Sequence, residues 1–272
     1  MSFISENLKR IKPSATMVIT AKAAQLKREG KKVIGLSSGE PDFDTPKHVK
    51  EAAIDAINKG YTKYTNIEGI PELRQCIVEK FKKDNDLNYT INDIIVGTGG
   101  KQILYNALVS SLNEIDEVII PAPYWVSYPD MTLLAGGKPI IVNCSSKTDF
   151  KLTAEALEKV VTKNSKWLIL NSPSNPTGSC YSKEELENIA SVVRKHENLH
   201  VMTDDIYEYI VYDNYKFFTF AQVAPDLKDR TLTVNGVSKS YCMTGWRIGY
   251  AAGPEKLIKA MIKIQGQSTS NP

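Results

Sequence analysis

The side chains best suited to chemistry are Lys239 and Arg247. They lie eight positions apart in the segment Val234-Asn-Gly-Val-Ser-Lys-Ser-Tyr-Cys-Met-Thr-Gly-Trp-Arg-Ile-Gly-Tyr250. A lysine amine forms a Schiff base with an aldehyde, and an arginine guanidinium holds a phosphate. Pyridoxal 5'-phosphate carries both groups, so the pair predicts a site for that cofactor. For such a pair alone, a solvated lysine and an arginine at the start of a strand are the ordinary alternative.

Two further segments end in polar groups that could serve the same cofactor. The apolar run Trp167-Leu-Ile-Leu170 predicts a buried strand, and Asn175 follows it in a turn with two prolines and a glycine. Asp204 ends a second apolar run, and Tyr207 comes three residues later. An aspartate there can pair with a protonated ring nitrogen, although a helix N-cap is the common alternative. In parallel α/β sheets, ligands bind at this edge of the sheet.

A third segment combines an apolar strand with glycines and a following helix, in Ile94-Ile-Val-Gly-Thr-Gly-Gly-Lys-Gln-Ile-Leu104. Glycine lets the backbone approach a phosphate closely, and the helix N-terminus offers free amide hydrogens to it. The segment is not a P-loop, because Gln102 follows Lys101. It is not a dinucleotide fingerprint either, because that pattern requires glycine or alanine at position 102.

Taken together, these segments resemble the class I and II aminotransferases of the fold type I pyridoxal-phosphate enzymes, and most of all the bacterial aspartate aminotransferases. The resemblance covers the whole chain in the order of the family. Its further segments are Lys12-Pro-Ser-Ala-Thr16, Gly39-Glu-Pro-Asp-Phe-Asp-Thr-Pro46, Thr62-Lys-Tyr-Thr65, Gly69-Ile-Pro-Glu-Leu-Arg74 and Pro123-Tyr-Trp-Val-Ser-Tyr128. Asn175-Pro-Thr-Gly178 and the pair Ser238-Lys and Gly245-Trp-Arg247 are its most specific parts.

The resemblance implies a role for each matching residue. Lys239 matches the catalytic Schiff-base lysine, and Asp204 matches the partner of the pyridine nitrogen. Asn175 and Tyr207 match the two groups that hydrogen-bond the ring oxygen. Trp125 matches the aromatic side chain that stacks on the ring, and with Asn175 it would also contact the substrate.

The same resemblance implies a phosphate site and a dimer. Arg247 and the backbone of Gly99, Gly100 and Lys101 match the groups that surround the phosphate. Tyr64 matches a residue that reaches the phosphate of a neighbouring subunit, so we expect a homodimer.

The implied substrates are an amino acid and a 2-oxo acid, with aspartate and 2-oxoglutarate as the expected pair. Gly39 matches a residue near the substrate carboxylate, and Lys12 and Lys101 are candidates for the side-chain carboxylate of a dicarboxylic substrate. Alanine, aromatic amino acids, or prephenate with glutamate are the alternative substrates, because close relatives of this site use them. Decarboxylation and β-elimination are rival reactions on the same fold.

Members of the resembled family run to about four hundred residues, as the resemblance implies, whereas this chain has 272. The C-terminal arginine that clamps the substrate α-carboxylate has no counterpart. We therefore expect a C-terminally truncated chain that binds the cofactor poorly and turns over little, and a non-catalytic dimerising fragment is a further alternative. The expected division is an N-terminal arm and incomplete small domain over 1–45 and a large cofactor-binding domain over 46–272.

The elements needed to position these residues are short strands alternating with helices, which predicts a three-layer α/β/α fold with a mostly parallel sheet. Strands are expected near 33–36, 94–97, 117–120, 138–142, 166–170, 200–204, 231–235 and 247–251. Helices are expected near 15–29, 46–59, 70–83, 100–112, 126–135, 153–163, 182–196 and 254–266. Thr45 with Pro46 predicts one helix start, and Ser182 with Glu185 predicts a capping box.

Composition excludes several other classes. The net charge of +3 is too small for a nucleic-acid signature, and no apolar run is long enough to span a membrane. Four cysteines without a C-x-x-C pair favour neither a zinc cluster nor disulfides, and free thiols suggest the cytoplasm. His196-Glu-Asn-Leu-His200 matches the zinc protease motif, but we expect a helix to end and a strand to begin within it, which separates the two imidazoles. No metal site is therefore expected.

Overall fold

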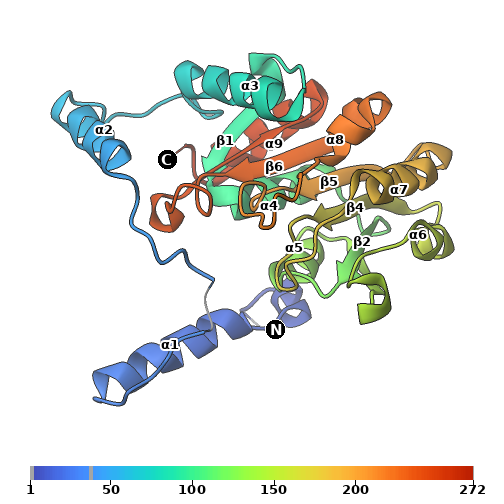
Figure 1. The fold of residues 1–272 in the computed structure, drawn as a ribbon, viewed down its shortest axis with the longest axis horizontal. Helices are drawn as coiled ribbons and strands as arrows, with labels where there is room; N and C mark the ends of the chain where they lie inside the picture. The colour runs from blue at the N-terminus through green and yellow to red at the C-terminus, as the bar shows by residue number, and fades with distance from the viewer. Residues whose placement is uncertain (1–2, 37–38, 272) are drawn as a thin grey trace.

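The computed structural model describes residues 3–36 and 39–271, and within them one seven-stranded sheet forms the centre (Figure 1). The strand order is β1-β7-β6-β5-β4-β2-β3. The strands are β1 (Ile94–Thr98), β2 (Glu117–Ala122), β3 (Lys138–Asn143), β4 (Ser165–Asn171), β5 (His200–Asp204), β6 (Thr231–Gly236) and β7 (Ile248–Ala252).

The sheet is mostly parallel, as the alternation of elements predicted. Strands β3, β2, β4, β5 and β6 run parallel to one another, whereas β7 is antiparallel to both of its neighbours, β6 and β1. The carboxyl ends of β4, β5 and β6 therefore meet along one edge, where ligands bind in such sheets.

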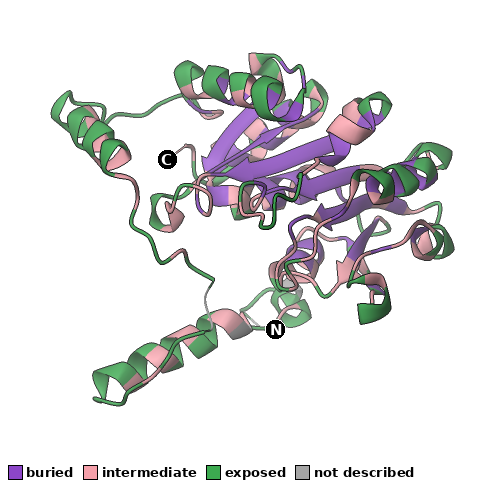
Figure 2. Ribbon diagram, in the orientation of Figure 1, coloured by how far each residue is buried: buried purple, intermediate pink, exposed green. Residues whose placement is uncertain are grey.

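Helices cover both faces of this sheet, which confirms the three-layer fold. One face carries α4 (Gly99–Ser111), α5 (Ser127–Leu134) and α9 (Glu255–Ser268). The other carries α3 (Pro71–Asn85), α6 (Ala154–Val160), α7 (Lys183–Lys195) and α8 (Phe220–Val223). Alternate residues of β4 serve the two layers: Trp167 and Ile169 pack on the first face, Leu168 and Leu170 on the second. Figure 2 shows the resulting buried sheet.

The N-terminal part lies beside this body and is largely exposed (Figures 1 and 2). It contains the 3-10 helix η1 (Glu6–Arg10), which contacts α5, and helices α1 (Ala15–Arg28) and α2 (Lys47–Asn58). The prediction of a strand near 33–36 is wrong. Ile34 and Leu36 are 88% and 92% exposed, and the segment pairs with no strand among the described residues. An isolated extended segment has no ladder to complete, whatever its apolar content.

Most predicted helices and strands are confirmed, with differences at their ends. The capping box of Ser182 and Glu185 is present at the start of α7. Thr45 does not cap α2; its hydroxyl donates to the carbonyl oxygen of Cys242, 2.6 Å away, so a tertiary contact replaces the local one. Arg247 precedes β7 and does not belong to it. The elements not predicted are α8 and the 3-10 helices η1, η2 (Ile91–Asp93), η3 (Ser146–Thr148), η4 (Pro225–Arg230) and η5 (Thr244–Trp246).

Among the described residues, no helix combines the length and the apolar character that crossing a membrane requires.

Candidate functional site

A cavity of about 680 Å³ opens at the carboxyl edge of the sheet. Most of the candidate residues line it, although they come from six separate parts of the chain. Its lining includes Gly39, Gly100, Lys101, Trp125, Tyr128, Asn171, Asn175, Asp204, Tyr207, Lys239 and Arg247. The strand register brings two of them together, because Asn171 and Asp204 are paired as the last residues of β4 and β5.

Asp204 is the buried acid of this cavity, with 7% of its surface exposed. Its Oδ2 accepts a hydrogen bond from the Tyr128 hydroxyl at 2.7 Å, and its Oδ1 accepts one from the Ile206 amide at 3.4 Å. Burial raises the pKa of Asp204, and these two hydrogen bonds act in the opposite direction. Such a carboxyl gains from a cationic partner, because the partner repays the cost of burying its charge.

Asn171 joins this acid to the loop after β4. Its amide nitrogen donates to the backbone oxygen of Asp204 at 2.7 Å, and its side-chain oxygen accepts from the Asn175 amide at 2.7 Å. The amino-acid sequence does not single out Asn171. Only the strand register makes it a neighbour of Asp204, and the one local signal was its position at the start of the proline-rich turn.

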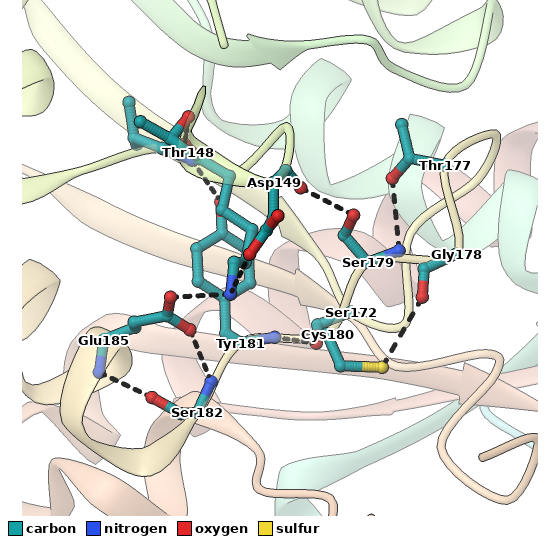
Figure 3. A network of polar contacts seen from close by, with 12 residues as sticks. Thr148, Asp149, Ser172, Thr177, Gly178, Ser179, Cys180, Tyr181, Ser182 and Glu185 are labelled. Carbon is teal, nitrogen blue, oxygen red and sulfur yellow. Dashed lines mark hydrogen bonds and ion pairs between the residues drawn. The ribbon is translucent and has the colours of Figure 1, made fainter. Parts of the chain in front are cut away.

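A polar network holds the loop that carries Asn175 (Figure 3). The Ser179 hydroxyl donates to the backbone oxygen of Asp149 at 2.6 Å, and the Tyr181 amide donates to the Ser172 hydroxyl at 3.1 Å. The buried Tyr181 hydroxyl in turn accepts from the Leu152 amide at 2.8 Å. These bonds fix both ends of the loop, so the Asn175 side chain extends from a rigid support and hydrogen-bonds Tyr207.

Lys239 lines the same cavity. Its amine donates a hydrogen bond to the backbone oxygen of Gly39 and lies 6.0 Å from the centre of the Tyr207 ring. Burial lowers the pKa of the Lys239 amine, Arg247 lowers it further, and Glu40 opposes the shift. A larger fraction of the amine is therefore neutral near physiological pH than for a solvated lysine, and the neutral amine is the nucleophile and the base.

Arg247 and the start of α4 form an anion site. Arg247 has a φ of 58°, and its guanidinium donates to the backbone oxygens of Thr244 at 2.8 Å and Thr98 at 3.5 Å. These contacts hold the guanidinium directly over Gly99, so a Cβ atom there would overlap it. No side chain caps the helix at Thr98, so the first amide hydrogens of α4 stay available to a ligand.

The glycines here are required by packing as well as by φ. Gly99 has a φ of 78°, which side chains disfavour. A Cβ atom at Gly249 on β7 would overlap the backbone of Gly99 and Gly100. The strand can therefore press against the start of α4 only because both sides lack side chains.

Lys101 and Trp125 also line the cavity. The Lys101 amine lies 4.8 Å from the centre of the Trp125 ring, a cation–π distance. Burial lowers the pKa of Lys101, and the charge of Arg247 acts in the same direction. The charge of Arg247 thus repels both Lys101 and Lys239 within one cavity, and a bound anion would relieve this repulsion.

The cavity fits pyridoxal phosphate by the chemistry of its donors. The cations of the cavity and the uncapped helix start suit a phosphate. The buried Asp204 suits a protonated ring nitrogen, Asn175 and Tyr207 offer hydrogen bonds to a ring oxygen, and Lys239 offers an amine to the aldehyde.

Two predicted residues lie elsewhere. Lys12 is exposed between η1 and α1 and does not line the cavity, although Thr16 at the start of α1 does. Tyr64 is fully exposed after α2 and is likewise outside the cavity. A single protomer thus brings together all of the predicted residues except these two.

The residues that match the zinc protease motif lie in two different elements, as expected. Helix α7 ends at Lys195, and His200 begins β5, so the two imidazoles belong to different elements. The His196 ring lies 3.7 Å from Glu158, whereas Nδ1 of His200 lies 3.0 Å from the backbone oxygen of Asn198. A shared helical face, which the motif needs, is not formed.

Known proteins resemble the whole described fold. The family model for aminotransferase class I and II matches residues 31–272. A probable aspartate/prephenate aminotransferase of Rickettsia bellii is 61% identical, and an aspartate/prephenate aminotransferase of Cereibacter sphaeroides is 60% identical. Both matches cover 100% of this chain and 68% of the relative.

Two solved structures agree with this likeness. The aspartate aminotransferase from Rhizobium meliloti matches with a TM-score of 0.96 at 52% identity, over 100% of this chain and 68% of that one. The Thermus thermophilus aspartate aminotransferase with maleate matches with a TM-score of 0.96 at 45% identity, over 100% of this chain and 70% of that one.

Proposed function

The chain belongs to the class I and II aminotransferases, which are pyridoxal-phosphate enzymes, and from this premise we propose that it transfers an amino group from L-aspartate to 2-oxoglutarate. The products are oxaloacetate and L-glutamate. The observation that carries the proposal is the convergence of Lys239, Asp204 and Arg247 on one cavity of about 680 Å³. These three supply an amine, a buried acid and a phosphate-binding cation.

Prephenate with glutamate is the second candidate pair. The relatives that are about 60% identical to this chain carry the name aspartate/prephenate aminotransferase, which gives both substrates for one protein. Aspartate, oxaloacetate and prephenate share a second carboxylate. Lys101 extends over Trp125 at the cavity wall, where its amine suits that carboxylate. Lys12, exposed between η1 and α1, is the weaker candidate for this role.

Each cavity residue then has a part in holding the cofactor. Arg247 and the backbone of Gly99, Gly100 and Lys101 would hold its phosphate, and Trp125 would cover its ring. Asp204 would keep the ring nitrogen protonated, and Asn175 and Tyr207 would donate to the ring oxygen. The chemistry that pyridoxal phosphate supplies when bound is electron withdrawal from the substrate α-carbon.

The residues of the chain bind the substrate and move its proton. Lys239 would hold the cofactor through its amine, and the same amine in its neutral form would take the α-proton of the substrate. Its lowered pKa keeps that neutral form accessible. Gly39 lies within hydrogen-bonding reach of the same amine, so the N-terminal arm borders the place where the substrate carboxylate would sit.

We propose a homodimer in which Tyr64 completes the phosphate site of the partner. Tyr64 is fully exposed in one protomer, and α2 contains no buried residue. Ile54 and Ile57 on this helix are 58% and 63% exposed, an apolar face that a second copy would cover. The division into an arm over 1–45 and a cofactor-binding part over 46–272 belongs to the same proposal, and the cytoplasm remains the predicted compartment.

The test is selective trapping of the cofactor. Pyridoxal phosphate is added to the purified chain, the product is reduced with borohydride, and the modified lysine is found by peptide mapping. We expect the label on Lys239, absent in Lys239→Ala and kept in Lys183→Ala, whose lysine starts α7. Label spread over surface lysines would overturn the site. Titration of the same complex measures the predicted weak binding, and assays with each substrate pair separate aspartate from prephenate.

A further inference from the structure

Tyr128 makes a contact that no role assigned above explains. Its hydroxyl donates to Oδ2 of Asp204 at 2.7 Å, and its side chain is 2% exposed. Tyr128 lies in the first turn of α5, a helix on one face of the sheet, whereas Asp204 ends β5. The bond therefore joins two layers of the fold at the candidate partner of the ring nitrogen.

The phenol of Tyr128 is a permanent donor. Burial raises its pKa well above the ordinary value, and the nearby charge of Asp204 adds to the shift. A phenol that does not ionise keeps its proton for the oxygen in front of it. Oδ2 of Asp204 must therefore accept, which favours the carboxylate over the carboxylic acid.

Of the groups that contact the Asp204 carboxyl, Tyr128 has the main influence on its charge state. The Ile206 amide reaches Oδ1 at 3.4 Å, a long hydrogen bond. Asn171 holds the backbone of Asp204 and does not touch its carboxylate. The other titratable groups that face Asp204 are Tyr207 and Asp205, and neither donates a hydrogen bond to it among those described.

Tyr128 is also linked to the wall that would cover the ring. The Tyr128 and Trp125 rings meet edge to face, with centres 5.4 Å apart and planes at 84°. The Tyr128 amide donates to the backbone oxygen of Trp125 at 3.1 Å. One short segment thus carries both the stacking side chain and the partner of Asp204.

We propose that Tyr128 is a positioning residue that keeps Asp204 ionised and oriented toward the ring nitrogen of the cofactor. The inference rests on the proposed function, because it takes Asp204 as the ring-nitrogen partner. It adds a specific consequence: the charge state of Asp204 is set before the cofactor arrives, by a hydrogen bond from α5.

The first measurement needs no cofactor. The chain is labelled with ¹³C at aspartate carboxyls, and the Asp204 signal, assigned with Asp204→Asn, is titrated by NMR. Tyr128→Phe keeps the ring and its contact with Trp125 and removes only the donor, so the pKa of Asp204 should rise. Replacing Tyr128 by 3-fluorotyrosine gives a more acidic donor of nearly the same size, so the pKa should fall. An unchanged pKa in both variants overturns the inference.

The second measurement uses the bound cofactor. Tyr128→Phe should weaken pyridoxal phosphate binding roughly tenfold, the scale of one hydrogen bond to a charged group, and shift the pH at which its absorbance changes. Tyr89→Phe is the matched control, because it removes the hydroxyl of another buried tyrosine in a different core cluster. It should leave both the affinity and the absorbance transition unchanged. A merely structural role would weaken binding in Tyr128→Phe without shifting the pH of the absorbance transition.

Asp204→Asn separates this inference from the proposed function. If Asp204→Asn alters cofactor affinity and absorbance while Tyr128→Phe does not, Asp204 keeps its proposed role and Tyr128 loses its own. If Asp204→Asn alters neither, the ring-nitrogen assignment itself fails. If both variants act, the double variant should add nothing to Asp204→Asn, because the hydrogen bond then has no carboxylate to serve.

Discussion

The amine of Lys239 donates a hydrogen bond to the backbone oxygen of Gly39, two hundred positions earlier in the chain. This contact brings the N-terminal arm to the lysine on which the proposed chemistry depends. The arm is otherwise largely exposed. Its contact with Lys239 lies where the arm borders the cavity. The reactive amine is thereby presented between the arm and the loop after β6.

Replacing this lysine tests the proposed reaction directly. Lys239→Ala should lower exchange of the substrate α-proton by at least about 10²-fold, because the positioned base is lost. The rate is measured by NMR in D₂O with aspartate and added cofactor. The control Lys183→Ala should exchange at the rate of the unmodified chain, and equal rates in all three proteins would refute the assignment of the base.

A substitution at Gly99 tests the proposed phosphate site. Gly99→Ala places a Cβ atom against the Arg247 guanidinium at a φ of 78°, and such a left-handed residue costs about 1–2 kcal/mol in itself. Binding of pyridoxal phosphate should weaken about tenfold or more, whereas binding of pyridoxal, which lacks the phosphate, should change little. Fluorescence titration with both ligands gives the comparison.

The control for this variant is Gly245→Ala, where an added Cβ would meet nothing within 4 Å. It should bind both ligands as the unmodified chain does. A loss of pyridoxal binding equal to that of pyridoxal phosphate in Gly99→Ala would show a general distortion instead of a phosphate effect.

Tyr64 tests the proposed dimer by complementation. If Tyr64 serves the partner's site, then Lys239→Ala and Tyr64→Ala chains that are unfolded, mixed and refolded together should form mixed dimers. Each mixed dimer would have one complete site. Trapped cofactor and α-proton exchange should reappear in the mixture at a level above either variant alone. Sedimentation of the unmodified chain as a monomer, or no recovery in mixed dimers, would contradict the proposal.

Asn171 tests how the acid and the loop are held together. Asn171→Ala removes both hydrogen bonds that join Asp204 to Asn175, each worth about 0.5–1.5 kcal/mol. We expect a free energy of unfolding lower by about 1–3 kcal/mol in urea melts, together with weaker cofactor binding. Asn188→Ala on the exposed side of α7 should do neither.

The buried carboxyl of Asp205 should make the stability of the protein depend on pH. Burial raises its pKa from 3.8 to about 8, so between these values the folded state binds a proton that the unfolded state has released. The stability that this group contributes is therefore present at acid pH and falls as pH rises toward 8. Glu208 and Lys80 face the same group, the first raising and the second lowering its pKa.

Asp205→Asn should flatten this part of the profile, because the amide does not titrate. Urea melts at half-unit steps between pH 4 and 9 measure the slope in both proteins, within the window of about 3.8 to 8 set by the two pKa values. Asp213→Asn, at an exposed turn, should keep the original slope. An equally steep fall in Asp205→Asn would assign the dependence to another group.

The local sequence pattern determined much of the fold, because the spacing of apolar residues and the residues that start and end helices and strands indicate the secondary structure. Short apolar runs such as 166–170, separated by helical stretches, predicted the mostly parallel sheet and all seven of its strands. The same logic failed at 33–36, because a strand exists only with a partner and the sequence does not say where a partner lies. At Thr45, a tertiary acceptor on Cys242 outcompeted the local cap.

For the site, the sequence by itself determined which chemical groups are present: an amine, an acid, an arginine, and glycines before a helix. It also predicted their common edge, because strands in a parallel sheet end together. The tertiary structure alone decided that Asn171 lies beside Asp204, that Tyr128 donates to the acid and that Gly39 meets Lys239. These pairs are separated by 33, 76 and 200 positions. The physical reason is that residue type and local spacing encode chemistry and secondary structure, whereas contacts across layers depend on register and packing.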